Sequence, residues 1–152
     1  MTAWFTTEVA ALLTLFGAAF GAATLLPFQS ELVFGAMQLR DVAPVWLLVL
    51  VASVGNTAGS VVNYIMGRGV ERFRGKRWFP VSERQLDRAG QWYRRWGLWS
   101  LLLSWAPFGD AITVVAGVLR TPLWSFLVLV ALAKTGRYIA LAWAIAAASG
   151  TA

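Results

Sequence analysis

Four long apolar blocks make up most of the chain, and charged residues are confined largely to the intervals between them. The blocks cover about residues 9–26, 45–66, 98–116 and 123–148, and the first two contain no charged residue. A helix needs roughly 20 apolar residues to cross a bilayer core of about 30 Å. Because a lipid-exposed backbone must satisfy its own hydrogen bonds, every block is expected to be helical. The pattern therefore predicts an all-α polytopic membrane protein.

Prolines interrupt the first and third blocks in the same way. Pro27 is followed by Glu31 and Pro107 by Asp110, and each carboxylate precedes a further short apolar segment. Proline removes a helical hydrogen-bond donor and pushes the preceding residue out of the helical conformation. The segments after the prolines are too short to cross a bilayer. We expect each half to contain a re-entrant hairpin or a broken helix, whose new N-terminus offers backbone donors to a phosphate.

The two halves also repeat one another in order. Both contain Pro-Phe, an acidic residue, Leu-Arg and Pro-x-Trp ahead of a long apolar helix, at offsets of 78 to 80 residues. Inverted repeats with discontinuous helices place the substrate site of many transporters at the membrane midplane. We therefore expect one membrane domain over 1–152, with an inverted repeat of a Pro-broken hairpin plus a transmembrane helix. Repeat one covers about 9–67 and repeat two about 98–149.

The interval 68–97 between the repeats is strongly basic. It carries nine Lys and Arg residues against three acidic ones, within a chain of net charge +6. Flanked by apolar spans, such a segment is expected in the cytoplasm and can contact anionic lipid headgroups, whereas nucleic acid is not an expected partner. An apolar stripe that includes Ala89, Tyr93 and Trp96 predicts an amphipathic helix that ends at Gly97. That helix lies either in the membrane interface or against the protein's own cytoplasmic face.

The composition limits the catalytic and metal-binding chemistry that the chain can support. The chain is 59% hydrophobic and 13% charged, and it contains neither cysteine nor histidine. The absence of histidine removes Ser-His and Cys-His catalysis and makes a zinc site improbable. The sequence thus predicts no enzyme, no cofactor and no metal.

Four ionisable residues, Glu31, Asp110, Lys134 and Arg137, fall in or beside apolar helices. Burying such a group in a bilayer costs roughly 2.5–3.5 kcal/mol on insertion scales, so each is a functional candidate. Lys134 and Arg137 share a helix face because they are three residues apart. Two interpretations stay open. The charges form a structural ion-pair network, or Glu31 and Asp110 couple proton or ion movement while Lys134 and Arg137 bind an anionic headgroup.

Further residues complete the candidate site. The proposed polar and small lining consists of Asn56, Gly59, Asn63 and Tyr138. Arg40 and Arg120 near the hairpin ends are additional headgroup-binding candidates, or they snorkel to the interface. The pairs Gly17/Gly21 and Gly55/Gly59 predict close helix packing. Tryptophans near the ends of the expected spans predict aromatic belts. They are Trp46, Trp92, Trp96, Trp99 and Trp124.

Several of these motifs resemble the DedA family, also called the SNARE-associated or VTT-domain family, and within it the short YqaA-like branch. The resemblance rests on the turn at 27–31, the Asn-Tyr-x-x-Gly-Arg run at 63–68 and the Pro-Phe-Gly-Asp turn at 107–110. It implies a bacterial inner-membrane protein with two opposed re-entrant hairpins, linked to envelope maintenance and to lipid movement. The mainstream family has arginine in a Phe-x-Arg-x-x-Pro motif, whereas Ser104 and Trp105 stand near the second proline here.

Residues and resemblance together predict a flippase-like protein that moves a lipid between leaflets, with proton coupling as one option. The expected cargo bears a phosphate, either a polyprenyl phosphate or a phospholipid. A proton- or ion-coupled transporter of a small solute and a non-transporting membrane organiser are the alternatives. Membrane lipids are the expected partners, and a homo-oligomer is left open.

Overall fold

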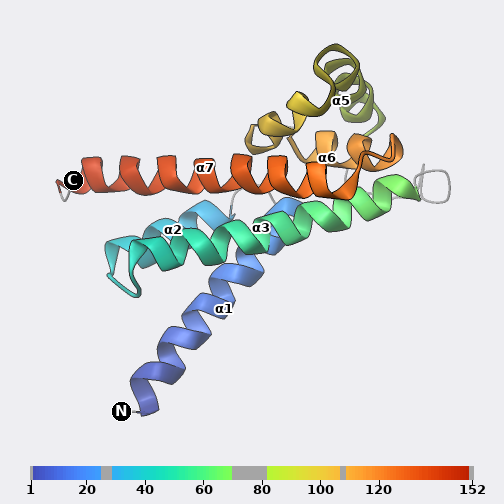
Figure 1. Ribbon diagram of the computed structural model, residues 1–152. Coiled ribbons are helices and arrows are strands. Elements are labelled where there is room, and N and C mark those ends of the chain that lie inside the picture. Colours follow the sequence, from blue (N-terminus) through green and yellow to red (C-terminus); the bar gives the residue numbers. More distant parts are fainter. Residues whose placement is uncertain (1, 25–28, 70–81, 107–108, 151–152) are drawn as a thin grey trace.

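Figure 1 shows the computed structural model of the protein, which describes residues 2–24, 29–69, 82–106 and 109–150 and is helical over most of them. In chain order the helices are α1 (Thr2–Thr24), α2 (Gln29–Leu39), α3 (Val45–Arg68), α5 (Glu83–Trp96), the 3₁₀ helix η1 (Gly97–Trp105), α6 (Gly109–Val118) and α7 (Leu123–Ser149). Among them α1, α3 and α7 are long and apolar enough to cross a membrane. The prediction of an all-α membrane protein is confirmed over the described residues.

The third apolar block differs from a regular helix. Its first part is the nine-residue 3₁₀ helix η1, which is long for a helix type that rarely exceeds four residues. Ala106 is extended, with φ −77° and ψ 164°, as expected for the residue before a proline. The chain becomes helical again at Gly109. Pro27 and Pro107 lie outside the described residues, between the end of α1 and the start of α2 and between the end of η1 and the start of α6.

Helices α3 and α7 run antiparallel through the centre of the molecule, side by side in Figure 1. Near one end the Tyr64 hydroxyl donates to the Thr121 carbonyl, at 2.5 Å. Near the other end Gln38, in α2, donates to the Ala142 carbonyl of α7 at 2.9 Å. The α2–α3 turn and the α6–α7 turn consequently lie at opposite ends of this helix pair.

The two turns share one backbone design. Asp41 and Arg120 adopt left-handed conformations, with φ 49° and 52°. Each donates its N–H to a carbonyl three residues earlier, and the next residue donates to one five residues earlier, which is the Schellman arrangement. Pro44 and Pro122 then precede the long helices. By turn geometry, the structural equivalent of Arg120 is therefore Asp41 rather than Arg40.

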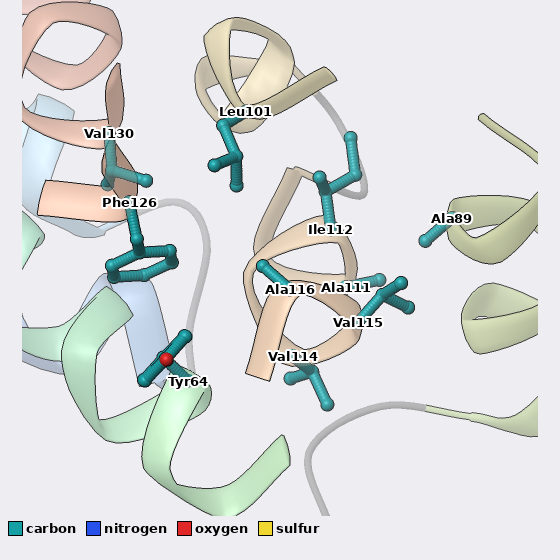
Figure 2. Close-up of a cluster of buried hydrophobic side chains, with 10 residues drawn as sticks. All are labelled: Tyr64, Ala89, Leu101, Ala111, Ile112, Val114, Val115, Ala116, Phe126 and Val130. Atoms are coloured by element: carbon teal, nitrogen blue, oxygen red, sulfur yellow. The ribbon is translucent and has the colours of Figure 1, made fainter. Parts of the chain in front are cut away.

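The amphipathic helix α5 packs against α6 and η1. Figure 2 shows Ala89 of α5 facing a cluster built around α6, to which α3, α7 and η1 also contribute. Packing on the protein's own surface, one of the two interpretations of this helix, is therefore observed. Gly97, with φ 56°, ends the helix as predicted. Trp96, a member of the predicted apolar stripe, is 54% exposed.

Only one of the two glycine pairs packs closely. A Cβ atom added at Gly55 would lie 2.6 Å from the Phe16 carbonyl oxygen, and one at Gly59 would lie 2.5 Å from that of Phe20. These glycines therefore let α1 approach the α3 backbone. The prediction was wrong for Gly17 and Gly21, where an added Cβ would meet nothing within 4 Å.

Candidate functional site

One face of α7 carries the first of two ion pairs. Lys134 and Arg137 lie on either side of the midpoint of this helix (Leu123–Ser149). Lys134 Nζ donates to Asp110 Oδ1 at 3.2 Å. The lysine side chain is 2% exposed, against 34% for the aspartate. The start of α6 is thereby joined to α7 through a lysine whose side chain is almost completely buried.

The second ion pair joins Arg137 to Glu31 in the first turn of α2. Arg137 Nε donates to Glu31 Oε1 at 2.9 Å, and Nη2 contacts the same oxygen. Arg137 Nη1 donates to the Trp105 carbonyl at 3.0 Å. The side chains are 27% and 35% exposed, respectively. One guanidinium therefore connects the start of α2 with the end of η1, so that both interruptions of the chain meet on α7.

A chain of buried hydroxyl and amide groups runs beside the Arg137–Glu31 pair. Asn56, at the midpoint of α3, donates through Nδ2 to the Tyr138 hydroxyl at 3.2 Å. That hydroxyl in turn donates to Ser30 Oγ at 3.1 Å. The Tyr138 ring packs against Phe34 with a centroid separation of 5.5 Å. These contacts hold α2, α3 and α7 together immediately next to Glu31.

Asn63 makes a similar link from α3 to the end of α1 and to α6. Its Nδ2 donates to the Ala23 carbonyl, in the last turn of α1, at 2.8 Å. The same nitrogen lies 3.3 Å from Thr113 Oγ1 of α6. Thr113 Oγ1 donates to the Asp110 carbonyl at 2.6 Å. The Oδ1 atoms of Asn56 and Asn63 are buried without a hydrogen-bond partner among the described residues, so both amides have acceptor capacity to spare.

The structure gathers most, but not all, of the residues that the sequence singled out. Gly59 faces α1 and serves packing. Arg40 and Arg120 are exposed at the two turns, away from the ion pairs. Sequence reasoning missed Ser30, although it adjoins Glu31, and Thr113, whose position one helical turn after Asp110 was a usable signal. Within the described residues no group of three or more His, Cys, Asp or Glu side chains could hold a metal ion.

Comparison with known proteins identifies the family. The sequence model of the VTT domain matches residues 3–147, which is nearly the whole chain. The chain belongs to the VTT-domain family, also called the DedA family. This VTT-domain protein is 38% identical over 138 residues to "Inner membrane protein YqaA" of Escherichia coli strain K12, covering 89% of this chain and 91% of the relative. It is 35% identical over 135 residues to an uncharacterized protein of Haemophilus influenzae, covering 84% and 82%.

No solved structure matches this VTT-domain protein. The family assignment and the three apolar helices together make it an integral protein of the inner membrane, as the sequence predicted.

Proposed function

We propose that this VTT-domain protein moves a phosphate-bearing lipid between the leaflets of the membrane, and that Glu31 and Arg137 form its working pair. The observation that carries the proposal is the partial exposure of this pair, 35% and 27%, at the middle of a spanning helix. Charged side chains at membrane depth face a water-filled cavity or the bundle interior rather than acyl chains. A partly exposed pair at that depth is therefore available to a polar ligand.

The chemistry of the exchange follows from the contacts. Arg137 presents a planar guanidinium, which binds carboxylate and phosphate with similar geometry. A lipid phosphate displaces the Glu31 carboxylate from Arg137, and the displaced carboxylate takes up a proton. Release of the lipid on the other side reverses both steps and restores the ion pair. First-turn N–H groups of α2 supply additional donors to the phosphate.

An inverted repeat gives the movement a framework. The same turn, with Asp41 or Arg120 in the left-handed conformation, occurs at opposite ends of the antiparallel α3–α7 pair. We take α2–α3 and α6–α7 as the two opposed units, with α2 and α6 as re-entrant arms. Rocking of one unit against the other exposes Arg137 alternately to each side, as in transporters built from inverted repeats.

The end of the molecule where arginines gather determines the orientation that we propose for the protein in the membrane. Arg68, Arg120 and the arginines of α5 lie at the end of the molecule that carries the α6–α7 turn. The positive-inside rule places this end, with the segment 68–97, in the cytoplasm. Cysteines introduced at Arg84 and Arg94 test the orientation in a chain without native cysteine. Labelling by an impermeant thiol reagent from outside intact cells would contradict it.

Transport in proteoliposomes tests the function directly. Separate vesicles contain a labelled polyprenyl phosphate, the corresponding uncharged polyprenol, or a labelled phospholipid. We expect protein-dependent movement of at least one phosphate-bearing lipid and none of the polyprenol, and an imposed pH gradient should change the rate. Equal movement of the polyprenol, or no movement of any lipid by protein that remains folded, would rule the proposal out.

A further inference from the structure

The outer side of α7 carries a second feature, which the ion pairs do not use. A groove of about 470 Å³ runs between η1 and α7. Its lining consists of Leu98, Trp99, Trp124, Ser125, Val128 and Leu129. Trp99 and Trp124 expose 68% and 80% of their surfaces. The volume falls within the roughly 300–1,000 Å³ that is usual for ligand sites. A lining that is apolar at every position except Ser125 suits a hydrocarbon chain.

This groove is separate from the candidate transport site. Ser125 and Lys134 are nine residues apart (134 minus 125), which is about two and a half turns at about 3.6 residues per turn, so they lie on opposite faces of α7. Lys134 is buried on the inner face, whereas Val128 is exposed on the outer one. A chain bound in the groove therefore does not reach the ion pairs.

Helix α5, which ends directly before η1, carries a charged and aromatic flank. We call this set the arginine–tryptophan flank, and its members are Arg84, Arg88, Trp92, Arg95 and Trp96, all of them exposed. At 3.6 residues per turn they fall on one side of the helix, with the tryptophans next to the packed face and the arginines further out. Through Gly97 the helix leads directly into η1 and the groove residues Leu98 and Trp99.

Firm packing fixes the orientation of the flank. Ala89 is buried against the cluster around α6 (Figure 2). The Tyr93 hydroxyl lies 2.6 Å from Thr121 Oγ1 in the α6–α7 turn, and Tyr64 of α3 donates to the carbonyl of the same threonine. The exposed side of α5 is thus held in place relative to α7.

We propose that the groove and the arginine–tryptophan flank form an accessory binding site for an anionic phospholipid. One acyl chain occupies the groove, and the headgroup phosphate binds Arg88 and Arg95. Tryptophan favours the membrane–water interface, and basic residues at the cytoplasmic surface attract anionic lipids. A lipid fits this surface because the groove belongs to a spanning helix and the adjoining flank is basic, which matches a chain and a charged headgroup in one molecule.

Fluorescence quenching by brominated lipids tests the site without requiring transport. The protein is placed in phosphatidylcholine vesicles that contain a minor fraction of brominated phosphatidylglycerol, or the same fraction of brominated phosphatidylcholine. The wild type should be quenched more strongly by the anionic lipid. Replacing both Trp99 and Trp124 with phenylalanine should remove most of the difference, because these tryptophans line the groove.

Matched variants distinguish a specific lipid-binding site from non-specific electrostatic attraction of anionic lipids. Arg95→Gln should lower the preference for phosphatidylglycerol roughly fivefold, the effect of about one basic residue near an anionic surface. The neighbouring Arg94→Gln, on the other side of α5, should change it little. Val128→Phe should fill the groove and weaken quenching by the anionic lipid, whereas Val54→Phe, at an exposed valine of α3, should not.

Four results would overturn the proposal. The first is equal quenching of the wild type by both lipids. The second is an equal loss of preference in Arg94→Gln and Arg95→Gln, which would indicate diffuse electrostatics only. The third is unchanged quenching in Val128→Phe. The fourth is protection of Trp99 and Trp124 that grows with the protein-to-lipid ratio, which would assign the groove to a second copy of the chain. Because the assay measures binding, its outcome is independent of the lipid transport proposed above.

Discussion

The two ion pairs on α7 look alike in sequence but differ in their surroundings. Lys134, which pairs with Asp110, is 2% exposed and makes one charged contact. Arg137, which pairs with Glu31, is 27% exposed and also binds the Trp105 carbonyl. A buried cation depends entirely on its partner, whereas a partly exposed guanidinium with a second acceptor can lose one contact and remain solvated.

This difference favours different roles for the two ion pairs, whose charges the sequence could only group together. The Asp110–Lys134 pair fits a structural part of the fold, because separating it leaves a bare charge in an apolar interior. In the proposed function the Glu31–Arg137 pair opens and closes at a modest free-energy change, as a binding site requires. We therefore propose that the structural interpretation applies to the Asp110–Lys134 pair and the functional one to the Glu31–Arg137 pair.

Asp110→Asn should produce the largest loss of stability. The change leaves the buried Lys134 without a counter-charge, and breaking a buried pair in this way costs about 3–5 kcal/mol. Lys134→Met should cost less, since the remaining Asp110 is one-third exposed. Chemical unfolding in detergent micelles measures both free energies. The double variant Asp110→Asn/Lys134→Met should recover most of the loss, and a double variant as unstable as Asp110→Asn alone would contradict the structural role.

Glu31→Gln should cost about 1 kcal/mol, because glutamine keeps an acceptor oxygen for Arg137 and the arginine retains the Trp105 carbonyl. Glutamine cannot take up a proton, so we expect lipid transport to become insensitive to an imposed pH gradient. The unfolding free energy and the transport rate at several pH values check the two parts. A loss of stability as large as that of Asp110→Asn would remove the distinction between the pairs.

Tyr138→Phe should have a similarly small effect on stability, about 1 kcal/mol, because one buried hydroxyl is lost while the ring contact with Phe34 remains. It should slow transport, since Ser30 beside Glu31 loses its donor. Tyr64→Phe is the matched control, as it removes a buried hydroxyl bonded to Thr121, outside the cluster. Equal transport rates in the two variants would show that the Tyr138 hydroxyl only stabilises the fold.

Much of the fold was readable from sequence because bilayer length and proline chemistry act locally. The apolar lengths predicted the spans of α1, α3 and α7, and the prolines predicted where the first and third blocks break. The 3₁₀ form of η1 was not predictable, because helix type there depends on how the segment packs against α6 and α7. The repeat also misplaced a turn residue, since Asp41 adopts the left-handed conformation although no glycine marks the position.

The charged residues of the site were recognisable because ionisable groups stand out in apolar segments. Which carboxylate pairs with which cation was not, because the answer depends on how α2 and α6 meet α7. The exposure that separates the pairs is likewise a property of the assembled helices. The glycine pairs make the same point, because Gly55/Gly59 and Gly17/Gly21 have the same spacing and only the first contacts another helix.

The central claim is that Glu31 and Arg137 bind and release the lipid phosphate, whereas Asp110 and Lys134 stabilise the fold. It is tested most directly by comparing two double variants that leave the net charge of the protein unchanged. Glu31→Gln/Arg137→Gln and Asp110→Asn/Lys134→Met each remove one pair without leaving an unpaired charge. Transport of a labelled polyprenyl phosphate or phospholipid is measured in proteoliposomes, after unfolding measurements have shown both proteins to be folded. We predict background transport for the first variant and near wild-type transport for the second. Transport that survives in the first variant would contradict the account.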